Sequence, residues 1–316
     1  MREPRVTRAF EPRWTINVVL VIAIVSAAWG QPATGAVKQR SFASIEDAAR
    51  ALVDAVKTGN RKEMLAILGE DGKGIVWSGD EVSDKRGRER FVAEWDAQHH
   101  FEAGGGKVVM VIGRDNFPFV IPIVPDGPGW RFDTAAGKEE ILNRRIGRNE
   151  LNTIQTCLAY VDAQREYYAR DPDKSGLLHY AQKFASSPGK RDGLFWPTKA
   201  GEAPSPLGLL VAKAQGEGYA KRSAAPVAYW GYYYRILTAQ GKDAPGGAYD
   251  YLAHGHLIGG FAMVAFPAEY GVSGVMTFVV NQDAIVYQKD LGPQTELIAR
   301  AMKQFNPDST WEKVKM

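Results

Sequence analysis

The chain has 316 residues, of which 45% are hydrophobic and 24% charged, and its formal net charge is +3. This is the composition of an ordinary globular protein, so a fibrous or largely disordered chain is excluded. Because the length exceeds the size at which a single core usually stops growing, we expect two folded domains after the N-terminal segment.

The N-terminus has the pattern of a secretory signal, in which basic residues precede a short apolar run and small residues follow it. The apolar run covers residues 16–29, and the small residues are Ala28 and Gly30. The basic residues before the run are Arg2, Arg5, Arg8 and Arg13. We expect residues 1–36 to be a signal peptide and short leader, which predicts a periplasmic or secreted protein without a membrane span after cleavage. An uncleaved anchor is the alternative, although the run is shorter than the roughly 20 residues that span a bilayer.

Cleavage would also change the charge. Residues 1–30 contain four Arg and two Glu, so their loss lowers the formal net charge from +3 to +1. The mature chain then has no excess of basic residues that points to DNA or RNA, and we expect no nucleic-acid partner. Cys157 is the single cysteine and lies in a helical pattern, where we expect it to be a small buried hydrophobic residue.

Residues 41–135 are predicted to form a first domain of helices followed by strands. Ser44 and Asn60 are expected to cap two helices, which Gly59 and Gly69 end. Farther on, the period of the apolar residues changes from 3.6 to about 2, which indicates strands. The remaining predicted elements are a helix over 88–98 and strands over 108–112, 117–124 and 130–132.

With DAVKTGNRKEMLAIL early and GWRFDT closing the last strand, this order resembles the cone-shaped nuclear-transport-factor-2-like (NTF2-like) fold. The resemblance implies an enzyme, a ligand binder or a structural module, and the fold alone does not choose among them. Aromatic side chains suited to lining such a cone are Trp77, Phe91, Trp95, Phe117 and Trp130. Candidate acids or bases are Asp80, Asp96, Asp115, His99 and His100, although the two histidines are better explained as a polar helix end.

A second domain is predicted over residues 136–316, opening with a helical pattern over 135–169. Gly147 interrupts this pattern, so we expect two helices or one bent helix, with the domain boundary near the glycine. Arg144, Arg145 and Arg148 cluster beside it. Such a cluster indicates either a solvated face or contact with an anionic partner or with acids of the other domain.

Residues 171–176 read Asp-Pro-Asp-Lys-Ser-Gly, which is the opening of a calcium loop. Asp171, Asp173 and Ser175 are therefore candidate metal ligands. The twelfth position is Gln182, where such a loop requires a bidentate Glu, so a simple acidic turn is favoured and calcium is the alternative. We expect no other cofactor.

The C-terminal part alternates short elements with turns. A short amphipathic helix over 177–184, a surface loop over 186–206 and a helix over 206–215 are expected first. Strands over 232–237, 261–266, 275–280 and 285–287 then predict an antiparallel meander that a helix must cover. Tyrosines on both faces of 232–237 indicate an inner strand. His254 and His256 flank a turn glycine and are a weaker metal candidate, with a polar hairpin turn favoured.

Two segments, RNELNTIQTCLAYVDAQREYYA and FAMVAFPAEYGVSGVMTFVVNQDAIVYQKDLG, resemble the long helix and final strands of pilin-like and pseudopilin-like subunits, although no apolar stalk begins the helix. GKEEILNRRIGRNELNTIQTCLAYVDAQREYYARD, GYYYRILTAQG, GGAYDY and FPAEYGVSGVMTFVVNQD resemble the bacterial domain of unknown function 2950 (DUF2950) family over nearly all of the mature chain. This resemblance implies an exported envelope protein without an assigned activity. The expected fold class is α+β, an NTF2-like domain followed by a helix packed on a pseudopilin-like meander.

The sequence lacks the motifs of P-loop, dinucleotide-binding, zinc-protease, thiol-redox and serine-hydrolase sites. We therefore favour a noncatalytic scaffold for protein–protein contacts in the cell envelope, with envelope proteins as partners and weak self-association as a further expectation. Its expected contact residues are Tyr232, Tyr233, Tyr234, Arg235, Glu269 and Tyr270. The alternatives are a module that binds a small apolar ligand in the N-terminal cone, and a hydrolase or isomerase with Asp96 or His99 as its base.

Overall fold

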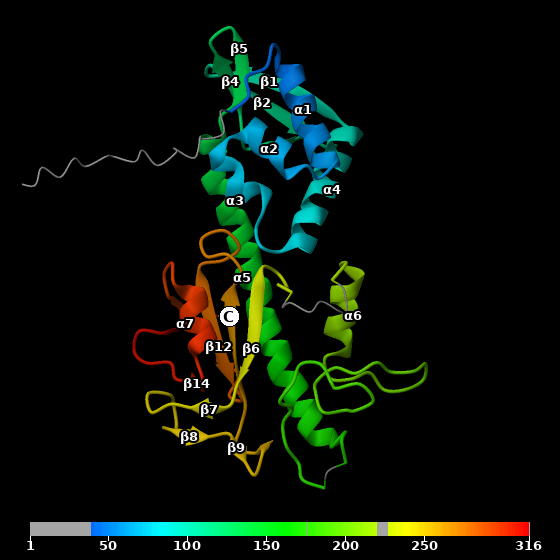
Figure 1. Ribbon diagram of the computed structural model, residues 1–316, viewed down its shortest axis with the longest axis vertical. Coiled ribbons are helices and arrows are strands. Elements are labelled where there is room, and N and C mark those ends of the chain that lie inside the picture. The colour runs from blue at the N-terminus through cyan, green and yellow to red at the C-terminus, as the bar shows by residue number, and fades with distance from the viewer. Residues whose placement is uncertain (1–38, 175, 220–226, 316) are drawn as a thin grey trace, which may run out of the picture. The chain divides into compact units, whose positions relative to one another are not determined.

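The computed structural model describes residues 39–174, 176–219 and 227–315, all within one compact unit, Val37–Met316 (Figure 1). The predicted leader and Ser175 lie outside the described residues. Helices and antiparallel sheets make up this part of the chain, which confirms the α+β class. None of its helices combines the length and the apolar character needed to cross a bilayer.

The first helices begin where their caps predict. Ser44 accepts a hydrogen bond from the Asp47 N–H and starts α1 (Ile45–Lys57), and Asn60 accepts one from the Glu63 N–H and starts α2 (Arg61–Leu68). The next helical elements are η1 (Glu70–Gly72), α3 (Lys73–Val76) and α4 (Glu81–Ala97). The last begins seven residues earlier than predicted, because the Asp80 carboxylate caps the Ser83 N–H ahead of a stretch with few apolar residues.

An antiparallel sheet follows, in the order β1-β2-β4-β5, with β3 also paired to β2. The strands are β1 (His99–Gly104), β2 (Lys107–Ile112), β3 (Phe117–Pro118), β4 (Ile123–Asp126) and β5 (Gly129–Phe132). The assignment of His99 and His100 to a helix end was wrong. They open β1 opposite Ile112 and Val111 of the buried strand β2, and this long-range pairing overrides their own polar, exposed pattern.

A single helix, α5 (Thr134–Arg170), connects the two halves of the described chain. The two-helix alternative was wrong, because Gly147 lies inside α5 and costs the helix only part of its stability. Figure 1 shows the first turns of α5 beside α3 and its later turns behind β6 and β12. The same helix therefore supports the elements on either side of it.

The segment after α5 is mostly irregular. The helix predicted over 177–184 was wrong: this stretch is irregular, with Tyr180 bridged to Leu257 and, just beyond it, Ala185 bridged to Phe195. One of the apolar residues that suggested a helix, Ala181, is buried in the core beneath α5. The predicted surface loop over 186–206 is present, and α6 (Gly208–Gly216) confirms the helix expected after it.

The second large sheet has the strand order β15-β13-β12-β11-β6. Its strands are β6 (Tyr232–Leu237), β11 (Ala262–Pro267), β12 (Met276–Asn281), β13 (Tyr287–Asp290) and β15 (Glu312–Lys313). The predicted four-stranded meander is confirmed, but the inner position of β6 was wrong. This strand is at the edge, and helices rather than a second neighbouring strand bury its two faces. The remaining short strands are β7 (Ala239–Gln240), β8 (Tyr249–Asp250), β9 (Leu252–Ala253), β10 (His256–Leu257) and β14 (Gln304–Phe305).

Alternation along the central strands divides their side chains between two cores. In β11, Met263 and Ala265 pack against α5, whereas Val264 and Phe266 face the side covered by α7 (Thr295–Ala301). The expected covering helix is therefore present on both faces. Cys157 of α5 is fully buried as expected, and burial raises the pKa of its thiol to about 12.

Candidate functional site

A cavity of about 540 Å³ lies between one face of α4 and one face of α5, and we call it the α4–α5 pocket. Its volume is within the usual range for small-molecule sites. From α4 it is lined by Ser83, Asp84, Gly87, Arg88, Arg90, Phe91 and Glu94. From α5 it is lined by Ile141, Arg144, Arg145, Arg148 and Asn149. Both sets repeat at intervals of three and four residues, so each describes one side of a helix.

The interior of the α4–α5 pocket is largely apolar. The first three helices, strands β2 and β3 and the segment after β3 contribute Leu52, Val56, Met64, Leu68, Ile75, Val76, Ile112, Phe117, Phe119 and Val120. Phe91 packs on Phe119 with ring centroids 5.3 Å apart, and several of the aliphatic residues belong to the core beneath α1 and α2. A guest in this cavity would therefore replace water with hydrocarbon over much of its surface.

The charged part of the lining is mainly basic, with five arginines facing three carboxylates, those of Asp84, Glu94 and Asp115. The guanidinium group of Arg145 donates to the backbone carbonyls of Gly74 and Ile75, where α3 ends. Burial lowers the pKa of Arg145, which the nearby Asp84 partly offsets. This arginine is a fixed part of the pocket wall.

Arg144 also has partners. It forms an ion pair with Glu140, one turn earlier in α5, and its guanidinium carbon lies 5.5 Å from the centroid of the Phe117 ring. The Phe117 ring is 49% exposed, so Arg144 and Phe117 together form part of the mouth of the α4–α5 pocket.

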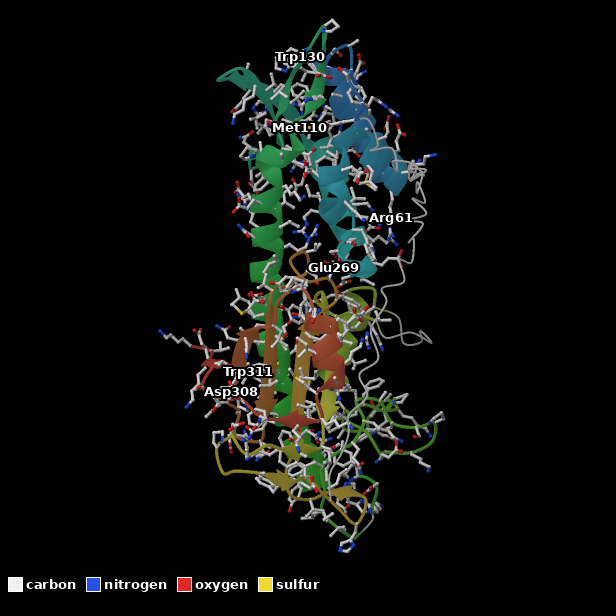
Figure 2. All side chains as sticks on the ribbon, turned by 60° about the vertical axis from the view of Figure 1, so that its left-hand side comes forward. Arg61, Met110, Trp130, Glu269, Asp308 and Trp311 are labelled. Carbon is white, nitrogen blue, oxygen red and sulfur yellow. The ribbon has the colours of Figure 1, made fainter. Side chains whose placement is uncertain are left out.

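The other three arginines of the pocket, Arg88, Arg90 and Arg148, form no ion pair and no side-chain hydrogen bond with any described residue. The Arg88 Nη1 atom is buried and has no acceptor. Burial lowers the pKa of Arg148, and the positive charge of Arg90 lowers it further. Figure 2 shows nitrogen-bearing side chains in the space between α4 and α5.

Gly87 leaves the wall of the pocket open at the middle of α4. A Cβ atom built at Gly87 has no neighbouring atom within 4 Å outside the helix backbone. Sequence reasoning identified the basic cluster of α5 but missed Gly87, Arg88 and Arg90. The RGRER segment was a usable signal, because it repeats arginine on a helix that had already been predicted to continue through Phe91 and Trp95.

Of the five aromatic residues predicted to line a cone, Phe91 and Phe117 line the α4–α5 pocket. Trp77 is 42% exposed beneath the guanidinium of Arg61, and Trp130 pairs with Phe42 across a β-bridge. Trp95 is buried in a separate core cluster, stacked on His99 at 3.7 Å between ring centroids. These three tryptophans are not among the residues that line the pocket.

The candidate acids and bases are dispersed. Asp96 and His100 are exposed, and the His99 ring lies on Trp95 with its Nδ1 2.9 Å from the Trp95 carbonyl oxygen. Asp115 lines the α4–α5 pocket, but no histidine or cysteine accompanies it among the lining residues. Asp115 is therefore the one predicted acid or base among the residues that line the pocket.

Asp80 has a different position, outside the lining of the pocket. It is 2% exposed and accepts hydrogen bonds from the Tyr219 hydroxyl at 2.7 Å and from the Gly231 N–H at 2.9 Å, besides capping α4. Burial raises the pKa of this carboxyl group, although its hydrogen bonds oppose the shift. Asp80 therefore links the start of α4 to Tyr219, which follows α6, and to Gly231, which precedes β6.

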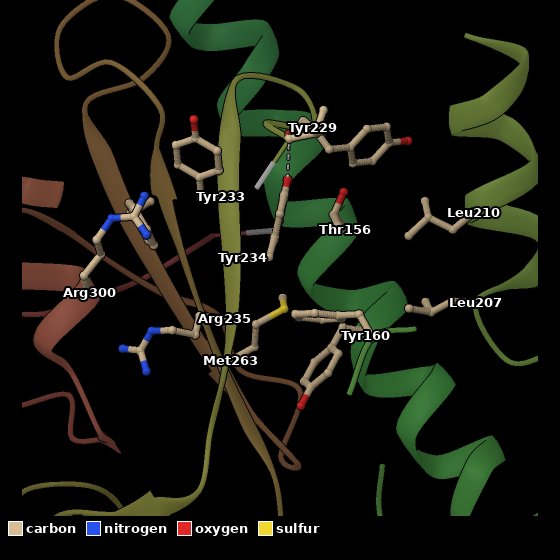
Figure 3. Close-up of a pocket in the computed structure, with 13 residues that line it drawn as sticks. Thr156, Tyr160, Leu207, Leu210, Tyr229, Tyr233, Tyr234, Arg235, Met263 and Arg300 are labelled. Carbon is tan, nitrogen blue, oxygen red and sulfur yellow. Dashed lines mark hydrogen bonds between the residues drawn. The ribbon is translucent and has the colours of Figure 1, made fainter. Parts of the chain in front are cut away.

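The residues predicted to contact partners lie near a second cavity of about 410 Å³ around β6 (Figure 3). Tyr232 is fully buried, and its hydroxyl donates to the Met276 carbonyl. In Figure 3, Tyr234 points toward α5 while Tyr233 and Arg235 lie on the opposite side of the strand. Because β6 separates these lining side chains, they do not converge on one guest.

The same residues are held by internal contacts. Tyr234 Oη lies 3.2 Å from the Tyr229 carbonyl oxygen, and Arg235 donates to the carbonyls of Ala299 and Met302 near the end of α7. Farther along the chain, Glu269 is exposed and Tyr270 donates to the Asp290 carboxylate. Glu269 is thus the most accessible of the predicted contact residues.

Among the described residues, which leave out Ser175, no group of three His, Cys, Asp or Glu side chains suits a metal ion. Asp171 adopts the left-handed conformation that ends α5, and Asp173 lies 2.9 Å from the His179 Nε2 atom. Gln182 donates to the Gly255 carbonyl, and the rings of His179 and His256 are 4.7 Å apart. His254 and Gly255 form the predicted hairpin turn between β9 and β10.

Comparison with known proteins gives one result. A family model described as "Protein of unknown function (DUF2950)" matches residues 39–314. No curated protein and no solved structure matches the chain. The predicted likeness of the two halves to NTF2-like and pseudopilin-like folds therefore stays a prediction.

Proposed function

Since the chain belongs to the DUF2950 family, whose description names no activity, we propose a function from its own pocket: binding a small, largely apolar molecule between α4 and α5. The observation that carries this proposal is the cavity of about 540 Å³, walled by side chains from helices α1 to α5 and from the first sheet. A cavity of this size and apolar content is typical of ligand sites.

Two features favour binding over catalysis. The described lining contains neither histidine nor cysteine, and Asp84 is already held by the Ser78 N–H and hydroxyl at 3.0 and 2.7 Å. Its remaining carboxylates, Glu94 and Asp115, have no imidazole among the lining residues to act with them as an acid–base pair. With the predicted export of the chain, the proposed ligand would be met in the periplasm or outside the cell.

We rank this role above the protein-contact scaffold because of where the aromatic residues lie. Tyr232 is fully buried, and Tyr233 packs on Phe266 with ring centroids 5.8 Å apart. Their side chains therefore pack against other parts of the protein. Among the predicted contact residues, Glu269 is the exposed one. A partner surface built on these tyrosines would need them to leave the core.

The test is a substitution that fills part of the cavity with a side chain placed at Gly87. Gly87→Phe introduces a ring into the α4–α5 pocket, whereas Gly147→Phe is the matched control, a helix-interior glycine with equal free space that does not line the pocket. Binding of Nile red, a neutral apolar dye, to the full-length chain is followed by fluorescence titration. We expect Gly87→Phe to weaken the affinity at least about tenfold, which is 1.4 kcal/mol, and Gly147→Phe to leave it unchanged.

Both variants are checked for folding by thermal unfolding before the titration. Equal affinity of Gly87→Phe and the unsubstituted chain would contradict the proposal, as would an unsubstituted chain that does not bind the dye.

A further inference from the structure

We propose that the ligand of the α4–α5 pocket is an amphiphile with one anionic head, a carboxylate or a phosphate, which Arg88, Arg90 and Arg148 bind while its apolar tail occupies the interior. This inference rests on the proposed function and specifies the chemical class of the ligand. The observation that carries it is a cluster of three guanidinium groups on the lining of one largely apolar cavity, one of which has a buried Nη1 atom without an acceptor.

The first step of the argument is the state of these three side chains in the described structure. Each lines the cavity and none has a carboxylate partner or a hydrogen-bond acceptor among the described residues. Removing a guanidinium group from water without an acceptor is costly, and Nη1 of Arg88 is buried in that condition. An anion at this position would supply the missing acceptors.

The second step is the repulsion within the cluster. Arg90 and Arg148 come from different helices, yet the charge of Arg90 disfavours the charged form of Arg148. Both side chains are exposed, so solvent weakens this repulsion, but the two positive groups line one cavity from two different helices. A negative head between α4 and α5 would convert that repulsion into two attractions.

The neighbouring arginines show that the chain pairs such groups elsewhere. Arg144 is paired with Glu140, and Arg145 donates to two backbone carbonyls, so neither is available to a ligand without losing a partner. Among the arginines that line the pocket, the unpaired ones are therefore Arg88, Arg90 and Arg148. Their combined charge of three exceeds that of Glu94 and Asp115, the two lining carboxylates not already held by Ser78.

The third step is the position of the apolar lining. Basic residues come from α4 and α5, whereas α1 and α2 contribute Leu52, Val56, Met64 and Leu68. A molecule with an anionic end and a hydrocarbon end matches both kinds of wall. Planar, multiply donating guanidinium groups suit carboxylate and phosphate oxygens equally, so the geometry defines the charge of the head and leaves its central atom to experiment.

The test compares heads on one tail. Decanoate, decyl phosphate and decanol share a ten-carbon chain, and inorganic phosphate provides a head without a tail. Calorimetric titration of the full-length chain should give at least about tenfold tighter binding of decanoate or decyl phosphate than of decanol, from one or more charge-assisted hydrogen bonds. The difference should shrink at high salt, and inorganic phosphate alone should bind more weakly than decyl phosphate.

The variants assign the preference to its residues. Arg88→Gln combined with Arg148→Gln should bring the anion-to-alcohol ratio close to one while decanol affinity changes little. Arg50→Gln is the matched control, an exposed arginine of α1 outside the pocket, and should retain the full ratio. If the double variant does not fold, the head and salt comparisons on the unsubstituted chain decide the matter.

The outcomes separate the two proposals. Equal binding of decanol and the anions, or an equal loss of the ratio in Arg50→Gln, overturns the anionic head but leaves the apolar pocket. Failure of all three decyl compounds, together with failure of Nile red, overturns the pocket itself. Binding of inorganic phosphate as tight as that of decyl phosphate overturns the role of the tail.

Discussion

The α4–α5 pocket and the sheet around β6 both place polar side chains in apolar surroundings, and they differ in how those side chains are satisfied. Beside β6, the Tyr160 hydroxyl donates to the Ala262 carbonyl, and Arg235 donates through Nη2 to two carbonyls although its Nε has no acceptor. In the pocket, Arg88 and Arg148 have no such partner. Buried polar groups in folded proteins are normally paired, so the buried, unpaired Nη1 atom of Arg88 indicates a binding role more than a structural one, whereas Arg148 is exposed to solvent.

The comparison also separates two uses of aromatic residues. Phe278 of β12 is fully buried under α5, whereas Phe117 lies half exposed at the mouth of the pocket. Phe278 fills a hydrophobic core, whereas Phe117 lines a cavity. Stability is therefore expected to depend on the sheet and binding on the pocket.

The largest expected effect is on stability. Phe278→Ala removes a fully buried ring and should lower the free energy of unfolding by about 3–5 kcal/mol. Phe117→Ala should lower it by no more than about 0.5 kcal/mol while weakening ligand binding. Urea unfolding measures both values. Similar losses in the two variants would remove the distinction between core and pocket.

A contrast in thiol reactivity should be nearly as large. Cys157 is fully buried with its pKa raised to about 12, so we expect almost no reaction with a disulfide reagent at pH 8 in the folded chain. Gly87→Cys in a Cys157→Ala background places a thiol of pKa about 8.5 at the pocket wall and should react about a thousandfold faster. Decanoate should slow the second reaction. Fast labelling of Cys157 would show that the core beneath α5 opens readily.

A smaller effect concerns Asp80, which joins α4 to the β6 side of the molecule. Burial raises its folded-state pKa above the ordinary 3.8, so the folded chain retains this proton to higher pH than the unfolded chain does. Its contribution to stability is therefore complete below about pH 3.8 and is lost as the pH rises through the folded-state pKa. Asp80→Asn should remove this fall from the pH profile of the unfolding free energy.

Asp192→Asn is the control with opposite sign. A hydrogen bond from Lys183 lowers the pKa of Asp192, so its contribution is present above the unfolded-state pKa and is lost as the pH falls. A profile for Asp80→Asn with the same slope as the unsubstituted chain would contradict the assignment.

The smallest effect is a modest stabilisation. Gly87→Ala and Gly147→Ala both add a methyl group to a helix interior with free space around it, and each should raise the free energy of unfolding by about 0.5–1 kcal/mol. The melting temperature should rise in both variants, with little change in the affinity for Nile red. Destabilisation at Gly87 alone would mean that the pocket wall does not tolerate even a methyl group.

Local chemistry was enough to predict several elements. Ser44 and Asn60 supply cap acceptors within three residues of the N–H groups they satisfy, and strand alternation assigned the β11–β12–β13 meander. The errors have a common cause. His99 and His100 joined a strand, and the irregular stretch 177–184 bridges to Leu257 through Tyr180, because pairing with other parts of the chain outweighed local preference.

The candidate site was predicted only in part. Its α5 arginines cluster in a predicted helix, and two of its aromatic residues, Phe91 and Phe117, were predicted to line a cavity of the first domain. The two arginines of α4 were not, since nothing in the sequence states that α4 and α5 face each other across a cavity. That arrangement depends on the packing of two helices that the whole first sheet separates along the chain, since α4 ends at Ala97 and α5 begins at Thr134.

The sequence by itself determined the α+β class, the helix caps, the strand alternation and the buried state of Cys157, because each depends on neighbours within a few residues or on the need to bury apolar surface. The tertiary structure decided which arginines find partners and which do not. Pairing depends on the distances between groups from separate elements, and those distances exist only once the helices have packed.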